Sequence, residues 1–450
     1  MKNPFIAFSD SPDTPKASQP SGFTENPERR YLDAEFHARP PIPLPGPTYV
    51  SHFVFLHDGI DYHGDQAHLD SFNLDGSWDM SESTDAYRWY SRAEVAMRYE
   101  LHTEFSSYTF FLALSASGSN ETFAPDATLR DWIAAIPGQL LVATNIELQS
   151  AEVVAPQQKI AEVSIAGNQT VVTQVVDGKG WIFTDFKIVD GASHFLLLNA
   201  GLSPRQAGRT VQRLWEIETY RVTALLGLPV AKAITARLRG AEEQLAAMMD
   251  QMCSSRSSDE ECAVLDDLIQ LAAEVEHSVA RTTFRFSATR AYEAIVMQRI
   301  SELREQRVEG FPTLFELMQR RLMPSVNTCA AMARRQDDLS ARVARNSQLL
   351  RTRIDLALKR QNQLVLTQMN HRARLQLLLQ ETVEGLSVIA ITYYGCQLVR
   401  YLAEGAGKLW SGLSPEYVTA ASIPVIAITV ALGLRSMRRQ IANMPTPDQE

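Results

Sequence analysis

Histidines and carboxylates in the first half of the chain are the side chains whose types and spacing could do chemistry. His102 and Glu104 stand two residues apart, so on an extended strand both side chains would point to the same face. An imidazole and a carboxylate placed together could hold a metal ion or share a proton. His37 and Asp185 complete this candidate site, and the competing interpretation is a hydrogen-bonded pair that binds nothing. Further histidines that could join it are His52, His57, His63 and His68.

Established catalytic and cofactor motifs do not occur in the sequence, which has no P-loop, GxGxxG, GxSxG or HExxH pattern. The four cysteines lack CxxC spacing and predict neither a zinc site nor a disulfide framework. We therefore predict no enzymatic activity and no cofactor. A soluble-domain enzyme that uses His37, His102 and Glu104 is the third of three functional hypotheses.

Two clusters of opposite charges lie at helical spacing farther along the chain. Acidic and basic residues three to five positions apart on one helix can pair at its surface. We interpret both clusters as salt-bridged helix faces without chemistry of their own. The first contains Arg209, Arg213, Glu216, Glu218 and Arg221, and the second contains Arg299, Glu302, Arg304 and Glu305.

Up to about Leu202, the elements that must position these residues are predicted to be both strands and helices. Short runs rich in β-branched and aromatic residues, bounded by Gly, Asp, Asn or Pro, are typical of strands. The predicted strands are residues 49–56, 105–114, 139–147, 159–165, 171–175, 181–189 and 194–199, and the predicted helices are 64–74, 85–99 and 127–135.

From Ser203 onward almost the whole sequence has helical periodicity, with helices predicted at 205–226, 230–252, 260–308 and 312–323. After Pro324 a helical pattern continues without Gly or Pro to Glu384, which would make about 90 Å of helix. One face of it carries residues in steps of three and four, which predicts packing on a partner helix of the same chain or of another copy. This stalk stripe consists of Ile354, Leu358, Gln361, Val365, Met369, Arg372, Gln376, Leu379 and Val383.

Two uncharged apolar stretches, residues 385–399 and 417–434, close the chain and predict a membrane hairpin. Each is near the length that crosses a bilayer core of roughly 30 Å. Arginines flank both outer ends, whereas the connecting residues 400–416 carry no net charge. The positive-inside rule then puts both termini in the cytoplasm and 400–416 outside. The competing interpretation is a pair of buried helices in a soluble domain.

Charge is distributed unevenly along the chain. The net charge of −9 divides into −15 for residues 1–329, +6 for residues 330–383 and zero for the remainder. A basic stalk next to a bilayer would be attracted by anionic lipid. An acidic chain whose arginines are not interleaved with aromatic residues excludes nucleic acid as a partner.

Eight stretches of the sequence resemble the signature stretches of an uncharacterised family of bacterial integral membrane proteins, a domain of unknown function. The resemblance covers most of the chain in the same order and implies a pair of C-terminal spans in the bacterial inner membrane, without an activity. The stretches are YLDAEFHARP at 31–40, YELHTEFSSYTF at 99–110, IPGQLL at 136–141, TDF at 184–186, GRTVQRLWEIETYRVTALLGLP at 208–229, RFSATRAYEAIV at 285–296, RRLMPSVNTC at 320–329 and LQETVEGLSVIAITYYG at 379–395.

The layout also resembles that of CorA-type magnesium transporters, in which a cytoplasmic domain and a long stalk helix lead into two C-terminal spans. This resemblance implies a homo-oligomer around the stalk and first span and a divalent cation as a possible partner. The chain lacks the Gly-Met-Asn signature of those transporters and has Tyr393-Tyr394-Gly395 within the span. A cation channel is therefore one hypothesis, and a membrane-anchored scaffold or sensor with a cytoplasmic binding domain is the alternative. The candidate pore-lining residues are Ser387, Thr392, Tyr393 and Gln397.

The predicted fold class is α+β, with an N-terminal mixed α/β domain, a helical region with a very long stalk helix, and a C-terminal two-helix transmembrane hairpin. The predicted segments are a disordered N-terminus at 1–28, the α+β domain at 29–202, helices at 203–324, the stalk at 325–384, the hairpin at 385–434 and a cytoplasmic tail at 435–450.

Overall fold

The computed structural model has the predicted α+β class and divides into two compact units. Residues 1–254 with 263–347 form the first unit, and residues 255–262 with 348–450 form the second. The structure describes residues 26, 28–29, 32–33, 41–57, 62–73, 78–84, 86–114, 127–166, 170–255, 257–407 and 415–442. Most of the predicted disordered segment 1–28, the middle of the predicted loop 400–416 and the last eight residues of the predicted tail lie outside these ranges.

A ten-stranded sheet dominates the first unit, in the order β10-β7-β8-β9-β6-β1-β5-β4-β3-β2. Among the described strands, β6 and β9 pair in parallel and the other neighbours pair antiparallel. The strands are β1 (Thr48–Leu56), β2 (Asp79–Thr84), β3 (Tyr87–Arg92), β4 (Val95–Leu101), β5 (Phe105–Ala113), β6 (Gln139–Ser150), β7 (Val171–Val175), β8 (Gly180–Val189), β9 (Ala192–Asn199) and β10 (Gln306–Arg307).

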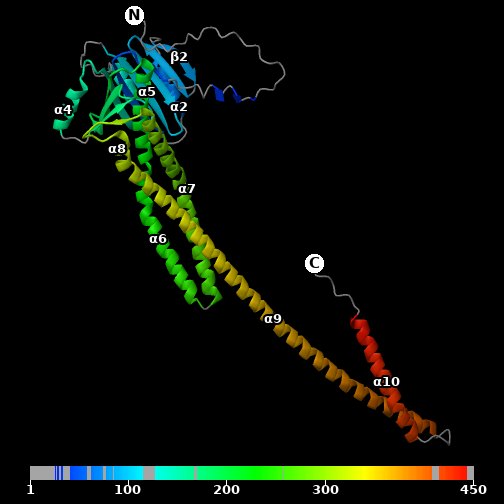
Figure 1. Ribbon diagram of the computed structural model, residues 1–450. Coiled ribbons are helices and arrows are strands. Elements are labelled where there is room, and N and C mark those ends of the chain that lie inside the picture. Colours follow the sequence, from blue (N-terminus) through cyan, green and yellow to red (C-terminus); the bar gives the residue numbers. More distant parts are fainter. Residues whose placement is uncertain are drawn as a thin grey trace. The chain divides into compact units, whose positions relative to one another are not determined.

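Alternation along the strands divides their side chains between two covered faces, because successive residues point to opposite sides of a sheet. On β1, Val50 and Val54 belong to the face that α5 (Pro204–Leu225) covers. Phe53 and Phe55 belong to the opposite face, under α2 (Tyr62–Phe72) and α3 (Ala127–Ala134). Figure 1 shows α5 packed along the sheet, and the site described below lies on that face.

Local sequence explains why α5 begins where it does and lies so close to the preceding chain. Ser203 and Gln206 form a reciprocal capping box, and Pro204 occupies the first turn. At Gly208 a Cβ would stand 1.8 Å from the carbonyl oxygen of Ile42, so only glycine permits this approach. The helix then buries Val211, Leu214 and Trp215 against the sheet.

Two predicted elements are wrong. In each, a strand pattern and a helix pattern of apolar residues were mistaken for one another. Within residues 85–99, predicted as a helix, residues 87–99 form most of the hairpin of β3 and β4, with a tight turn at Ala93, whose φ is 48°. Residues 159–165, predicted as a strand, lie in helix α4 (Pro156–Ala166). There Ile160 and Val163 are three apart on one helical face and pack on the sheet.

Helices α6 (Gly227–Ser254), α7 (Ser258–Leu303) and the first part of α9 (Met323–Gly407) pack side by side in the first unit, after the short α8 (Leu314–Arg321) (Figure 1). Gln336 of α9 accepts a hydrogen bond from Thr282 of α7 at 3.0 Å and donates one to Ser278 at 3.0 Å. Arg335 of α9 pairs with Glu242 of α6. The stalk helix is therefore fixed at its N-terminal end by both neighbours.

In the second unit, α10 (Pro415–Ala442) folds back along the end of α9, and Ile426 lies against Gly395. Two helices of the described chain are long and apolar enough to cross a membrane, one ending at Ala406 and the other at Glu416–Ser436. Their apolar windows are not buried in the protein. These exposed windows do not fit the competing interpretation, which requires helices buried in a soluble domain.

Candidate functional site

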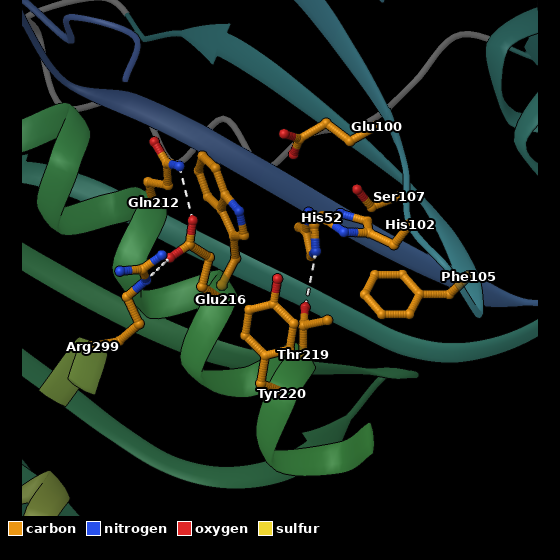
Figure 2. Close-up of a pocket in the computed structure, with 11 residues that line it drawn as sticks. His52, Glu100, His102, Phe105, Ser107, Gln212, Glu216, Thr219, Tyr220 and Arg299 are labelled. Carbon is orange, nitrogen blue, oxygen red and sulfur yellow. Dashed lines mark hydrogen bonds and ion pairs between the residues drawn. The ribbon is translucent and has the colours of Figure 1, made fainter. Parts of the chain in front are cut away.

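A polar pocket of about 210 Å³ lies on the α5 face of the sheet, and we call it the His52 pocket (Figure 2). Its walls come from β1, from β4, β5 and their connection, from α5 and from α7. It is lined by His52, Glu100, His102, Phe105, Ser107, Gln212, Trp215, Glu216, Thr219, Tyr220 and Arg299.

His52 forms the buried floor of the pocket. Its Nδ1 lies 2.8 Å from the hydroxyl of Thr109 and its Nε2 lies 3.1 Å from that of Thr219, so each ring nitrogen has a partner. The ring also stacks on Trp215, with 5.6 Å between centroids. Burial lowers the pKa of His52 to about 3, with the carboxylate of Glu100 opposing this shift. The imidazole is therefore neutral at physiological pH and has no free nitrogen for a metal ion.

A buried ion pair stands beside this histidine on β4. The guanidinium of Arg98 donates to Glu100 at 2.5 Å, and the exposed fractions of the two side chains are 1% and 6%. Burial acts to lower the pKa of Arg98, but the charge of Glu100, the hydrogen bond to it and the nearby Tyr87 and Glu216 together raise the pKa above its ordinary value. The guanidinium also lies over the rings of Tyr87 and Trp215, at 5.6 and 5.9 Å. Within the described part of the chain, its Nε and Nη1 have no hydrogen-bond acceptor.

A second charge network closes the opposite wall and joins α5 to α7. Glu216 pairs with Arg299 and also accepts from Gln212 at 2.8 Å (Figure 2). Arg299 contacts Glu302 as well, and Glu302 accepts from Arg213 at 3.0 Å. Burial acts to lower the pKa of Arg299, whereas Glu216 and Glu302 raise it, so the arginine stays charged. Each carboxylate of the pocket thus has an arginine beside it.

The predicted pair of His102 and Glu104 does not lie on a strand. Both residues are in the connection between β4 and β5, and their side chains take different partners. His102 stacks on Phe105, with 4.4 Å between centroids, and lines the His52 pocket. Glu104 pairs with Arg285 and accepts from the hydroxyl of Tyr292 at 2.7 Å, both on α7. The turn therefore removes the common face that strand geometry would have supplied.

Of the other predicted site residues, Asp185 does not line this pocket. His37 lies outside the described residues. Asp185 is on β8, where the pairing with β9 shifts register, and its carboxylate accepts from the main-chain N–H of Lys187 at 3.0 Å. Asp185 lines two other pockets. Within the described ranges no three His, Cys, Asp or Glu side chains are arranged to hold a metal ion.

Ser106, His57 and Asp65 meet on the opposite face of the sheet, but their geometry is not that of a catalytic triad. His57 Nε2 lies 2.9 Å from the hydroxyl of Ser106 and 3.1 Å from a carboxylate oxygen of Asp65. A triad needs the serine and the carboxylate on different ring nitrogens, so that one orients the ring while the other takes the proton. Here one nitrogen contacts both groups, and the cluster is structural.

The candidate pore-lining residues lie on α9 in the second unit. The hydroxyls of Ser387 and Thr392 donate to carbonyl oxygens one turn earlier, at Val383 and Val388, over 2.8 and 2.7 Å. Gln397 donates to the hydroxyl of Tyr393 at 3.4 Å. These four side chains therefore have partners within their own helix.

Two charged pairs at the pocket could not be recognised from the sequence, each for its own reason. Arg98 and Glu100 stand two apart, so on a strand both point to one face, whereas a helix would place them on different sides. The wrong helix at 85–99 therefore hid a charged pair directed into the core. Glu216 and Arg299 were assigned to two separate surface clusters, although they pair with each other between α5 and α7.

Comparison with known proteins assigns most of the chain to one protein family. A search of curated proteins finds no match for the chain. The model of the family described as "Protein of unknown function (DUF3422)" matches residues 24–441, which include both units and both apolar helices. The chain belongs to this family.

Proposed function

We propose that this chain is a membrane-anchored sensor whose His52 pocket binds a small molecule of no net charge. The observation that carries the proposal is that Arg299, in the pocket wall, belongs to α7, which packs against the first part of α9. α9 is a single helix that continues into the first apolar stretch. A ligand that displaces α7 from α5 would act on the helix that leads to the bilayer.

The charges of the pocket define the ligand class. Glu100 and Glu216 are each matched by an arginine, and His52 is neutral. A ligand with a net charge would have to disrupt one of these pairs, which is costly for the buried pair of Arg98 and Glu100 and less so for the partly exposed pair of Arg299 and Glu216. A neutral or zwitterionic ligand would not.

The size of the His52 pocket and the residues of its walls narrow the class of ligand further. A volume of about 210 Å³ corresponds to roughly seven water molecules at about 30 Å³ each. The rings of Phe105, Trp215 and Tyr220 offer flat apolar surfaces, while Ser107 and Gln212 offer hydrogen-bonding groups. We infer a metabolite of amino-acid or nucleobase size.

The proposed anchor is the pair of apolar helices in a bacterial inner membrane. Support comes from their exposed apolar windows and from the flanking charges. Arg372 and Arg374 precede the first stretch, and Arg435, Arg438 and Arg439 follow the second. Both termini would then be cytoplasmic, with residues 400–416 outside.

Cation transport is the second candidate function, favoured by the polar side chains at Ser387, Thr392, Tyr393 and Gln397 within an apolar helix. Their bonds within the helix use the hydroxyl and amide hydrogens and leave the oxygens of Ser387, Thr392 and Gln397 able to coordinate a cation. The test is Mg²⁺ flux into liposomes that contain the full chain. If the chain carries a Mg²⁺ flux and Thr392→Ala and Gln397→Ala reduce it, the helices form a transport path rather than an anchor alone. The sensor hypothesis predicts no flux.

Ligand binding is tested by thermal unfolding of the full chain in detergent with millimolar uracil, L-glutamine or L-serine as probes. We expect at least one probe to raise Tm, because a compound that binds only the folded state stabilises it. Gln212→Leu removes a pocket amide and should abolish the rise.

The matched control is Gln298→Leu. Gln298 donates to Glu302 at 3.0 Å, four residues on, as Gln212 does to Glu216, but it lies outside the pocket. The control should keep the full rise in Tm. An equal loss in both variants, or no rise with any probe and no small molecule retained in native mass spectrometry, would refute the ligand proposal.

A further inference from the structure

The stalk stripe is an apolar surface that changes from buried to exposed along one helix. Leu339 and Val343 of α9 are buried in the bundle of the first unit, and Leu350 and Ile354 are also buried. From Leu358 to Val383 the apolar members of the stripe are exposed, with Leu379 at 66% and Val383 at 60%. The same face of α9 is thus a packing surface at one end and uncovered at the other.

The change coincides with the end of the neighbouring helices. α6 ends at Ser254 and α7 begins at Ser258, and near this turn Glu261 pairs with Arg353 of α9 at 2.7 Å. Beyond Ile354, the stripe is exposed along the whole described stalk. The sequence therefore keeps a packing pattern for about thirty residues past the last described segment of its own chain that contacts it.

We propose that this uncovered part of the stalk stripe packs against the same surface of a second copy, as a parallel pair of helices in register. The parallel direction rests on the proposed membrane anchoring, because two identical hairpins in one bilayer hold their stalks in the same direction. The thirty residues from Ile354 to Val383 carry nine stripe positions over about four heptads, a length at which such a pattern indicates a coiled coil. About 45 Å of helix is available for the contact.

The spacing of the stripe supports pairing along its full length. Leu358, Gln361, Val365 and Met369 follow steps of three, four and four, an 11-residue repeat that keeps paired helices nearly straight. From Met369 to Val383 the steps alternate between three and four, the heptad spacing of a left-handed coiled coil. Two packing registers therefore join at Met369 without a break in the stripe.

The polar residues of the stripe determine the register in which two copies can pair. In an in-register parallel pair, Gln361 meets Gln361 and Gln376 meets Gln376, and side-chain amides can bond to each other in this arrangement. A shift of register would place these amides against Leu358 or Leu379 and leave them without partners. Arg372 can extend along the helix to water while its aliphatic part stays in the contact.

Cysteine cross-linking in native membranes tests the pairing. Val365→Cys lies on the stripe, whereas its neighbour Leu364→Cys lies on another face and is the more exposed of the two, at 66% against 49%. Both are placed in a chain with Cys253, Cys262 and Cys396 changed to Ser. After oxidation with copper phenanthroline, we expect at least about tenfold more disulfide-linked dimer from Val365→Cys, because only there do the Cα atoms come within disulfide range.

A second pair of variants keeps the test independent of disulfide formation. Leu358→Lys with Met369→Lys places two charges on the stripe 11 residues apart, and Leu364→Lys with Leu375→Lys places two charges 11 residues apart on another exposed face. In mass photometry of detergent-solubilised protein, the first pair should convert two-chain particles into single chains and the control should not.

Equal cross-linking at Val365→Cys and Leu364→Cys, or no effect of the stripe lysines on particle mass, would overturn the proposal. The membranes are washed with alkaline carbonate before oxidation. A chain that washes off contradicts the anchoring, whereas a chain that stays in the membrane and does not cross-link contradicts the pairing alone.

Discussion

At the residue scale, His52 shows how the surroundings of a group, rather than its type, decide what it can do. Its two threonine partners and the stacked Trp215 hold it as a neutral hydrogen-bonding group. The sequence places it among several histidines of equal promise for metal binding. The pocket contains His52 and His102, but as a floor and a wall rather than as ligands.

We predict that His52 makes the protein sensitive to acid. The folded pKa is about 3 and the unfolded value is about 6.5, so between these limits only the unfolded chain binds the proton. Stability is fully present above pH 6.5 and is lost as the pH falls, by about 2 kcal/mol between pH 6.5 and 5. In chemical denaturation at these two pH values, His52→Gln should lose about 2 kcal/mol less than the wild type.

The control for this prediction is His194→Gln, on β9, where the histidine is exposed and bonds to the carbonyl oxygen of Val189. It should leave the acid sensitivity unchanged. If His52→Gln shows the same loss as the wild type and this control, His52 is not the group that titrates.

The buried pair of Arg98 and Glu100 gives a second prediction. Arg98→Met leaves the carboxylate of Glu100 without its guanidinium in a buried site, which should lower the free energy of unfolding by about 3 to 5 kcal/mol. Arg98→Met with Glu100→Leu removes both charges and should recover most of that loss. Urea denaturation measures both variants, and a double variant as unstable as the single one would contradict the electrostatic explanation.

The limits of sequence reasoning at this scale are geometric. The individual residue types were visible, but the partners of Arg299, Thr219 and Glu104 lie between 83 and 188 positions away. No spacing along the chain encodes such contacts. They arise only when α5 and α7 pack on the sheet.

At the element scale, the long helices and most strands followed from period and boundary residues. The bounds of α5 fit the prediction because its capping box is local. The hairpin of β3 and β4 was missed because Ala, Glu, Met and Arg favour a helix, whereas burial on the sheet imposed the strand period. Tertiary packing thus overrode local preference where the pocket is built.

Two helical glycines should respond in opposite directions to the same substitution. Gly208→Ala would press a methyl group onto the carbonyl oxygen of Ile42 and should destabilise the first unit by about 1 to 3 kcal/mol. Gly240, on α6, has no atom within 4 Å of an added Cβ. Gly240→Ala should therefore stabilise by about 0.5 to 1 kcal/mol, through helix propensity alone.

Thermal unfolding of the two variants and of the wild type measures these effects on stability. The close approach of α5 to the preceding chain predicts a lower Tm for Gly208→Ala and a higher one for Gly240→Ala. Equal Tm shifts would mean that this approach does not constrain the first unit.

At the scale of the whole molecule, the chain joins an acidic first unit to apolar C-terminal helices through a basic stalk. The uneven charge agrees with a stalk that ends at an anionic lipid surface. The apolar stretches were identifiable from sequence, since length and composition suffice for them. What covers the stalk stripe could not be assigned in this way, because a periodic stripe is the same for a partner in the chain and for another copy.

The central claim is that the C-terminal helices cross a bilayer and hold the first unit on its cytoplasmic side. The direct measurement is labelling of intact and permeabilised cells with a membrane-impermeant maleimide. Ser411→Cys and Thr446→Cys are compared in the chain with Cys253, Cys262 and Cys396 changed to Ser. The account predicts labelling at position 411 in intact cells and at position 446 only after permeabilisation. Labelling of neither or of both positions in intact cells would contradict it.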